Sequence, residues 1–199
     1  MSVASIILLL LIPSAAGVFA GYATGGRLAR LTEIRFRASW LLLLAALFQA
    51  AQYYARPVRN LLEHRLGLPP LALVFALVAT WLVVNLLQWP TAIRLAGAAI
   101  FLGAALNGLV ILVNGRMPYS PAAAELAGIK PGLATPKNMP AGSGTRLGLL
   151  GDTFPVSPLH EVFSPGDAFI VLGGSSLIAL AMRGNRRATS VLTAGGGEQ

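Results

Sequence analysis

The chain contains five long apolar runs, which are separated by polar or Pro- and Gly-rich connections. Their lengths are close to the ~20 residues that an α-helix needs to cross a lipid bilayer. The pattern predicts an all-α fold, a polytopic transmembrane helix bundle of about five spans, in which residues 1–187 form a single transmembrane domain and residues 188–199 a disordered tail. The predicted spans cover residues 3–22, 40–55, 71–89, 94–115 and 165–182.

The first run, Val3 to Tyr22, has a second interpretation. Its apolar stretch passes into small residues, as the hydrophobic region of a signal peptide does before its cleavage site. However, no positively charged region precedes it, so we favour a retained span with a kink at Pro13.

Arginine residues gather in three connections and set the expected orientation. Positively charged residues are enriched on the cytoplasmic side of membrane proteins. If these regions are cytoplasmic, the N-terminus lies outside and the C-terminus inside a cell inner (plasma) membrane. Arg56, Arg59 and Arg65 lie in a connection on the opposite side and oppose this orientation. The residues concerned are Arg27, Arg30, Arg35 and Arg37, then Arg94, then Arg183, Arg186 and Arg187.

This orientation places residues 116–164 outside as a long loop. Its middle, Ala127 to Gly148, is rich in Gly and Pro and predicts irregular structure. Both ends of the loop carry turn signals, so we expect partial order. In the other outer connection, apolar residues at helical spacing within Arg56–Pro70 predict a short amphipathic helix on the membrane surface.

Composition supports a membrane protein. Only 11% of the residues are charged and the mean hydropathy is +0.70, whereas about a quarter of the residues in a soluble domain are charged. The net charge of +8 would suggest nucleic acid in a soluble protein, but arginines beside apolar runs fit anionic headgroups. We therefore expect membrane lipids, and no nucleic acid, as partners.

Cysteine is absent and only two histidines occur, far apart in the sequence. Thiolate nucleophiles and cysteine-ligated zinc are thereby excluded, and a histidine-based metal site is disfavoured. We expect no metal and no cofactor.

The few acidic residues concentrate in the stretch Leu150 to Gly174. There, "FSPGD" matches a helix start: Ser164 as N-cap, Pro165 as first helical residue and Asp167 at the third position, where a carboxylate meets free N–H groups. This interpretation accounts for Asp167. It does not account for Asp152, which follows a short apolar run and precedes a turn.

Polar residues at the outer end of the fourth span complete a candidate site. Asn107 and Asn114 lie seven positions apart and hence on one helix face. They predict either hydrogen bonds between helices or a polar pocket that opens to the outer face. Arg116 follows at the interface, as a cation that snorkels to the membrane surface or as a contact for an anion or headgroup. We take Asn114, Arg116 and Glu161 as candidate binding residues.

The motifs "NGRMP", "LGDTFP" and "FSPGD" together resemble a family of bacterial integral membrane proteins known only as a domain of unknown function (5317). The resemblance covers roughly Val3 to Met182. It implies a bacterial membrane protein and supplies no activity.

A second, local resemblance concerns "EVFSPGDAFIVLGG", which is similar to the segment of lipoprotein signal peptidases that carries one catalytic aspartate. It implies that Asp167 is one member of an aspartyl pair, with Asp152 the candidate for the other. The sequence departs from that family: Ser164 replaces an Asn, Gly166 replaces an Ala, and the surroundings of Asp152 lack the second motif.

Two functions follow from these observations. The leading hypothesis is a non-enzymatic membrane subunit or binding protein that uses an outer-face polar site to engage a lipid headgroup or a membrane protein partner. The alternative is an aspartyl membrane peptidase, in which Asp152 and Asp167 share a proton and cleave a lipid-anchored substrate.

Overall fold

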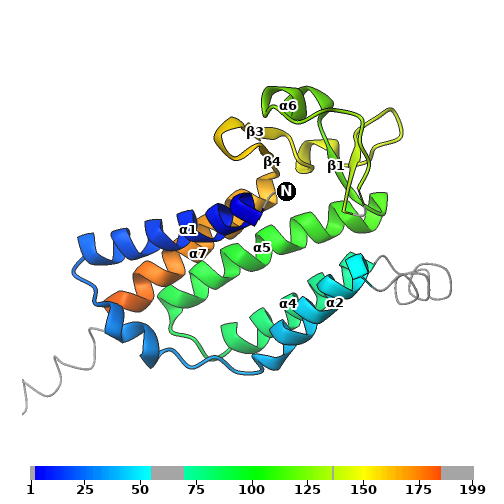
Figure 1. Ribbon diagram of the computed structural model, residues 1–199. Coiled ribbons are helices and arrows are strands. Elements are labelled where there is room, and N and C mark those ends of the chain that lie inside the picture. The colour runs from blue at the N-terminus through cyan, green and yellow to red at the C-terminus, as the bar shows by residue number, and fades with distance from the viewer. Residues whose placement is uncertain (1–2, 55–69, 136, 185–199) are drawn as a thin grey trace, which may run out of the picture.

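The computed structural model describes residues 3–54, 70–135 and 137–184. A long helix occupies each of the five predicted apolar runs, with bounds that differ from the prediction by at most three residues (Figure 1). The surface helix predicted for Arg56–Pro70, apart from its last residue, and the tail of residues 188–199 lie outside this part of the chain. The long helices are α1 (Val3–Ala23), α2 (Trp40–Tyr54), α4 (Pro70–Leu86), α5 (Thr91–Asn114) and α7 (Pro165–Arg183).

Two helices of the described chain, α5 and α7, are long and apolar enough to cross a membrane. Shorter apolar helices occupy Leu11–Ala23, Trp40–Ala51 and Ala72–Leu86. The protein is therefore mostly helical with two candidate membrane-spanning helices.

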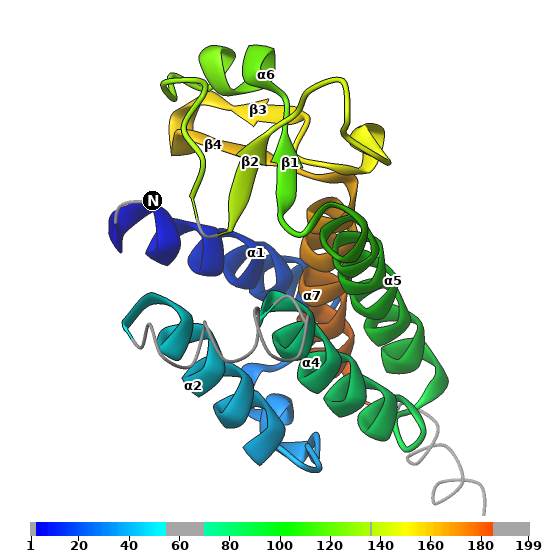
Figure 2. The same ribbon diagram turned by 90° about the vertical axis from the view of Figure 1, so that its right-hand side faces the viewer.

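The helices pack side by side in an order that differs from their order in the sequence. α7 lies between α1 and α5, α5 also packs against α4, and α4 packs against α2 (Figures 1 and 2). Glycines permit the close approach of α5 and α7: a Cβ atom on Gly173 would lie 2.7 Å from the Ala96 carbonyl oxygen. Small residues at helix contacts are the usual means of tight packing within membranes.

α4 ends at Leu86, three residues before the predicted end at Trp89. The backbone there closes into a turn in which the Trp89 N–H donates to the Asn85 carbonyl at 3.1 Å. Pro90 follows, and a residue before proline is kept out of the helical region by steric contact. Pro90 therefore ends the regular helix before its own position in the chain.

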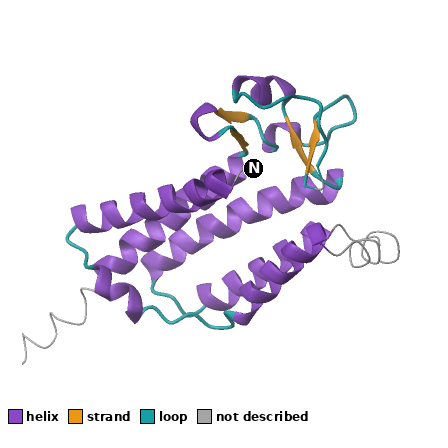
Figure 3. Ribbon diagram, in the orientation of Figure 1, coloured by secondary structure: helices purple, strands orange, loops and turns teal. Residues whose placement is uncertain are grey.

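Residues 115–164, which we call the cap, form a folded unit on the ends of α5 and α7 (Figures 1 and 3). A parallel pair joins β1 (Met117–Tyr119) to β2 (Asn138–Pro140), and an antiparallel pair joins β3 (Phe154–Val156) to β4 (Glu161–Phe163). The all-α prediction is thus wrong for the cap, and so is the irregular structure predicted over β2. The cap also contains α6 (Pro121–Leu126) and the short 3₁₀ helices η3 (Gly148–Leu150) and η4 (Ser157–Leu159).

The cap rests on an apolar cluster at the end of α5. Val110 and Ile111 of α5 are buried with Met117 of β1, and Phe75 and Leu150 pack against them. Because the chain leaves α5 directly into β1 through Gly115, this cluster fixes the first strand of the cap to the helix that carries it.

Candidate functional site

Asp167 is placed by the start of α7 as the motif "FSPGD" predicts. The Ser164 hydroxyl accepts the Asp167 N–H at 3.0 Å, and Asp167 Oδ2 accepts the Ser164 N–H at 3.0 Å, which completes a capping box. This prediction is confirmed.

Asn107 of α5 extends the network to the neighbouring helix. Its amide donates to Asp167 Oδ1 at 2.8 Å, and its Oδ1 accepts the Ser164 hydroxyl at 2.9 Å. The sequence pattern predicted hydrogen bonds from Asn107 to a neighbouring helix, and these bonds are present. Asp167 Oδ1 therefore holds α7 to α5 and Oδ2 closes the capping box of α7, so its position is accounted for by structure.

Asp152 is buried inside the cap, with 6% of its surface exposed. Its N–H donates to the Pro118 carbonyl at 2.9 Å and its carbonyl accepts the Ser120 N–H at 2.8 Å, so its backbone runs beside β1. Its Oδ2 accepts the amide of Asn138 in β2 at 2.6 Å. Asp152 thereby contacts both strands of the first sheet, β1 through its backbone and β2 through its side chain.

The pKa of Asp152 is raised from 3.8 to about 7. Burial is the main cause, because a carboxylate loses hydration there; the negative charge of Asp167 is the next, and Glu161 adds to it. The charge of Lys137 and the hydrogen bond from Asn138 oppose the increase. Near neutral pH the Asp152 carboxyl therefore exists in both protonation states.

The two aspartates are near enough for their charges to interact, but they are held by different partners. Asn138 donates to Asp152 and Asn107 donates to Asp167. In a pair that shares a proton the carboxyl groups lie about 3 Å apart and bind each other. The hydrogen bonds of these residues favour a structural role over that arrangement.

The remaining predicted site residues take different positions. Glu161 of β4 is half-buried, and burial raises the pKa of its carboxyl. Asn114, at the end of α5, accepts the Arg146 N–H at 2.9 Å and donates to the Arg146 carbonyl at 2.8 Å. Arg116 is exposed just before β1. The acids therefore lie inward, whereas Arg116 faces outward.

Sequence reasoning missed three cap residues that the structure brings to this site: Lys137, Asn138 and Arg146. All three fall in the stretch predicted to be irregular. The Met117 N–H donates to the Lys137 carbonyl at 2.9 Å, and Asn114 holds Arg146, so both cations lie beside the segment that contains Arg116. No local pattern marks them, since the pairing joins segments about 20 residues apart in the sequence.

The fold and site define a mostly helical protein with two candidate membrane-spanning helices that carry a polar cap. A family model, described as a family of unknown function (DUF5317), matches residues 33–179, and the chain belongs to this family. The matched range contains the whole cap, all of α5 and α7 as far as Ala179. No curated protein and no solved structure matches the chain.

Proposed function

We propose that the chain is a multi-pass protein of an inner (plasma) membrane, with five spans, the N-terminus outside and the C-terminus in the cytoplasm. α1, α2 and α4 contain apolar helical segments and are packed with α5 and α7 in one bundle. Many large apolar side chains of the bundle are exposed, as lipid contact requires. They include Phe19, Leu43, Leu47, Leu95, Leu102, Leu109 and Leu172.

The distribution of arginines supports the proposed orientation. Arg30, Arg35 and Arg183 line one cavity, so the connection after α1 and the end of α7 meet at one end of the bundle. The cap occupies the other end (Figure 1). The connection after α1 holds four arginines within residues 27–37, a higher density than the four exposed cations of the cap, residues 115–164, and this favours a cap that faces outward.

We further propose that the protein is a non-enzymatic membrane subunit whose cap binds an acidic surface of a partner protein. The observation that carries this proposal is the division of charge in the cap. Asp152 and Glu161 are turned inward, whereas the exposed charged residues of the cap are four cations and one acid. These exposed residues are Arg116, Lys130, Lys137, Arg146 and Glu125.

Apolar side chains on the cap favour a protein over a lipid headgroup as the partner. Leu126 of α6 is 69% exposed and Phe154 of β3 is 55% exposed. α6 and β3 are in contact and lie on the side of the cap away from the helices (Figure 2). In the proposed orientation this side faces away from the bilayer, and exposed apolar groups are typical of protein interfaces.

The predicted site residues have separate roles under this proposal. Arg116, with Lys137 and Arg146, contacts acidic groups of the partner. Asn114 positions Arg146 through its backbone. Asp152 joins the strands of the first sheet, Asp167 holds α7 to α5, and Glu161 lies half-buried in β4. The aspartyl peptidase is the weaker proposal, because the two carboxylates accept hydrogen bonds from separate partners: Asp152 from Asn138, and Asp167 from Asn107 and the Ser164 N–H.

Site-specific photocrosslinking tests the binding proposal. We expect a photoreactive residue at Leu126 or Phe154, incorporated in living cells, to give a protein adduct of one defined mass. The same residue at Leu109, which is exposed on α5, serves as the control and should not give that adduct.

A charge-reversed protein, Arg116→Glu with Lys137→Glu, should lose most of the adduct, since charge complementarity guides association. The matched control Arg37→Glu, at the other end of the bundle, should retain it. Adducts with lipid alone, or a protein adduct that survives the charge reversal, would contradict the proposal.

A further inference from the structure

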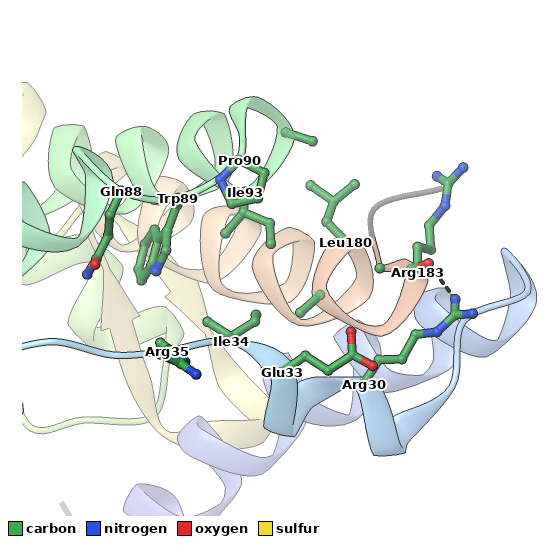
Figure 4. A pocket seen from close by; sticks show the side chains of 13 residues that line it. Arg30, Glu33, Ile34, Arg35, Gln88, Trp89, Pro90, Ile93, Leu180 and Arg183 are labelled. Carbon is green, nitrogen blue, oxygen red and sulfur yellow. Dashed lines mark hydrogen bonds between the residues drawn. The ribbon is translucent and has the colours of Figure 1, made fainter. Parts of the chain in front are cut away.

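A cavity of about 610 Å³ lies at the end of the bundle opposite the cap (Figure 4). It is enclosed by the 3₁₀ helix η1 (Leu28–Glu33) and the residues after it, by the turn between α4 and α5, and by the end of α7. Three arginines and one glutamate line it, and its apolar lining includes Trp89, Ile93 and Leu180. The charged residues are Arg30, Glu33, Arg35 and Arg183.

Hydrogen bonds to backbone carbonyls of α7 join the segment of η1 to the end of that helix. The Arg27 N–H donates to the Met182 carbonyl at 2.8 Å, and the Arg30 guanidinium donates to the Arg183 carbonyl. η1 thereby satisfies carbonyl groups that the end of α7 leaves free. The dashed line in Figure 4 marks the bond from Arg30.

The chain beyond η1 is fastened a second time. Asn85 of α4, which is fully buried, accepts the Arg37 N–H at 2.8 Å and donates to the Arg37 carbonyl at 3.0 Å. The segment that carries Arg35 is thus tied on both sides, to α7 and to α4. The cavity is preformed, which lowers the entropic cost of binding a ligand.

The charge of the lining selects an anion. Three arginines and one glutamate belong to the lining, so its excess charge is positive. Arg30 uses one of its five N–H donors on the Arg183 carbonyl and keeps the others. Planar guanidinium groups bind phosphate through paired, charge-assisted hydrogen bonds.

Trp89 adds an unused donor at the same cavity. Its side chain is 3% exposed, and its indole N–H has no hydrogen-bond partner within the described residues. In Figure 4 the indole extends toward the segment of Ile34 and Arg35. A buried donor without an acceptor is costly, and a ligand oxygen would supply one. Trp81, outside the cavity, has the same unpaired donor, so Trp89 supports the charge argument without carrying it.

We propose that this cavity binds a phosphate-bearing anion, attracted by the positive charge of its lining arginines, with the apolar lining against any attached glycerol or acyl portion. The phosphate belongs either to an anionic phospholipid or to a soluble anion. The site lies at the other end of the bundle from the cap and is independent of partner binding there.

Titration of the purified full-length chain in a neutral detergent tests the proposal. Three probes are compared by calorimetry and by tryptophan emission: short-chain phosphatidylglycerol, short-chain phosphatidylcholine and inorganic phosphate. We expect saturable binding of phosphatidylglycerol and none of phosphatidylcholine. If inorganic phosphate binds as tightly as phosphatidylglycerol, the ligand is a soluble phosphate; if it binds more weakly, the ligand is the lipid.

Variants separate the cavity from general surface charge. Arg35→Gln should weaken phosphatidylglycerol binding about fivefold, the effect of one basic residue near anionic headgroups. Arg37→Gln removes the same charge two residues away, outside the cavity lining, and should leave binding unchanged. Arg35→Gln is the decisive variant, because its exposed side chain is not used to hold η1 on α7.

Three results would overturn the proposal. They are equal binding of phosphatidylglycerol and phosphatidylcholine, no saturable binding of either phosphate-bearing anion, and equal weakening by Arg35→Gln and Arg37→Gln.

Discussion

Gly173→Ala is expected to destabilise the bundle, whereas Gly174→Ala, one residue further along α7, is not. A Cβ atom at Gly173 would lie 2.7 Å from the Ala96 carbonyl oxygen and 2.8 Å from Ile100 Cγ1. Both distances are shorter than a carbon atom tolerates, and the carbonyl belongs to the rigid backbone of α5. Adding atoms to a packed contact costs about 1–3 kcal/mol, and more where backbone must move.

Gly174 is a matched control on the same helix. Nothing outside its own helix lies within 4 Å of a Cβ atom placed there. Alanine stabilises a helix interior by roughly 0.5–1 kcal/mol relative to glycine, so Gly174→Ala should be neutral or slightly stabilising. The measurement is thermal unfolding in detergent for both variants. Equal melting temperatures would show that α5 and α7 do not pack as described.

The second large effect concerns pH and the cap. The folded cap favours the neutral form of Asp152, because the pKa of its carboxyl is about 7 in the fold against 3.8 for the free group. As far as Asp152 is concerned, the cap is therefore most stable below pH 3.8. Its stability falls as the pH rises from 3.8 to about 7 and changes little above that. Between pH 5 and pH 8 the free energy of unfolding of the cap should fall by roughly 2–3 kcal/mol.

Asp152→Asn should remove this dependence. An asparagine keeps an oxygen that can accept the Asn138 amide and carries no charge near Asp167 or Glu161. Hydrogen exchange of the amides in β1 and β2, measured at both pH values, reports the stability of the cap. In the variant the protection should change less with pH than in the unsubstituted protein, because Glu161 is then the remaining carboxyl of the cap with a raised pKa.

Glu125→Gln is the control, because Glu125 is exposed on α6. It removes one carboxyl from the same cap and should retain the pH dependence of the unsubstituted protein. If Asp152→Asn retains the same slope, ionisation of Asp152 does not govern the stability of the cap.

Local signals in the sequence were sufficient for the five long helices and for the start of α7, but not for α6 or the 3₁₀ helices. Apolar runs give the helix positions, and the capping box at Ser164 and Asp167 uses residues three positions apart. Such features depend on neighbours along the chain, and they are predictable for that reason. The end of α4 was misplaced by three residues, because the effect of Pro90 on the preceding turn was not included.

The sheets of the cap could not be predicted from the same signals. Each strand has three residues and three of the four contain a proline, so no alternation of apolar and polar residues marks them. β1 pairs with a strand about 20 residues away. The hydrogen bond from Asn138 and the raised pKa of Asp152 arise only from that pairing and the burial that comes with it.

The cavity at the end of the bundle opposite the cap could not be predicted from the sequence for a similar reason. Its arginines were visible in the sequence as topology signals. Their convergence depends on η1 docking against the end of α7, which no local pattern indicates.

Cysteine accessibility tests most directly the central claim, that the cap is the outward face of a membrane-embedded bundle. The chain has no cysteine, so single substitutions at two exposed serines, Ser143 in the cap and Ser39 at the opposite end, report without background. In right-side-out spheroplasts, a membrane-impermeant maleimide should label Ser143→Cys at once and Ser39→Cys only after permeabilisation. The reverse pattern, or immediate labelling of both positions, would contradict the account.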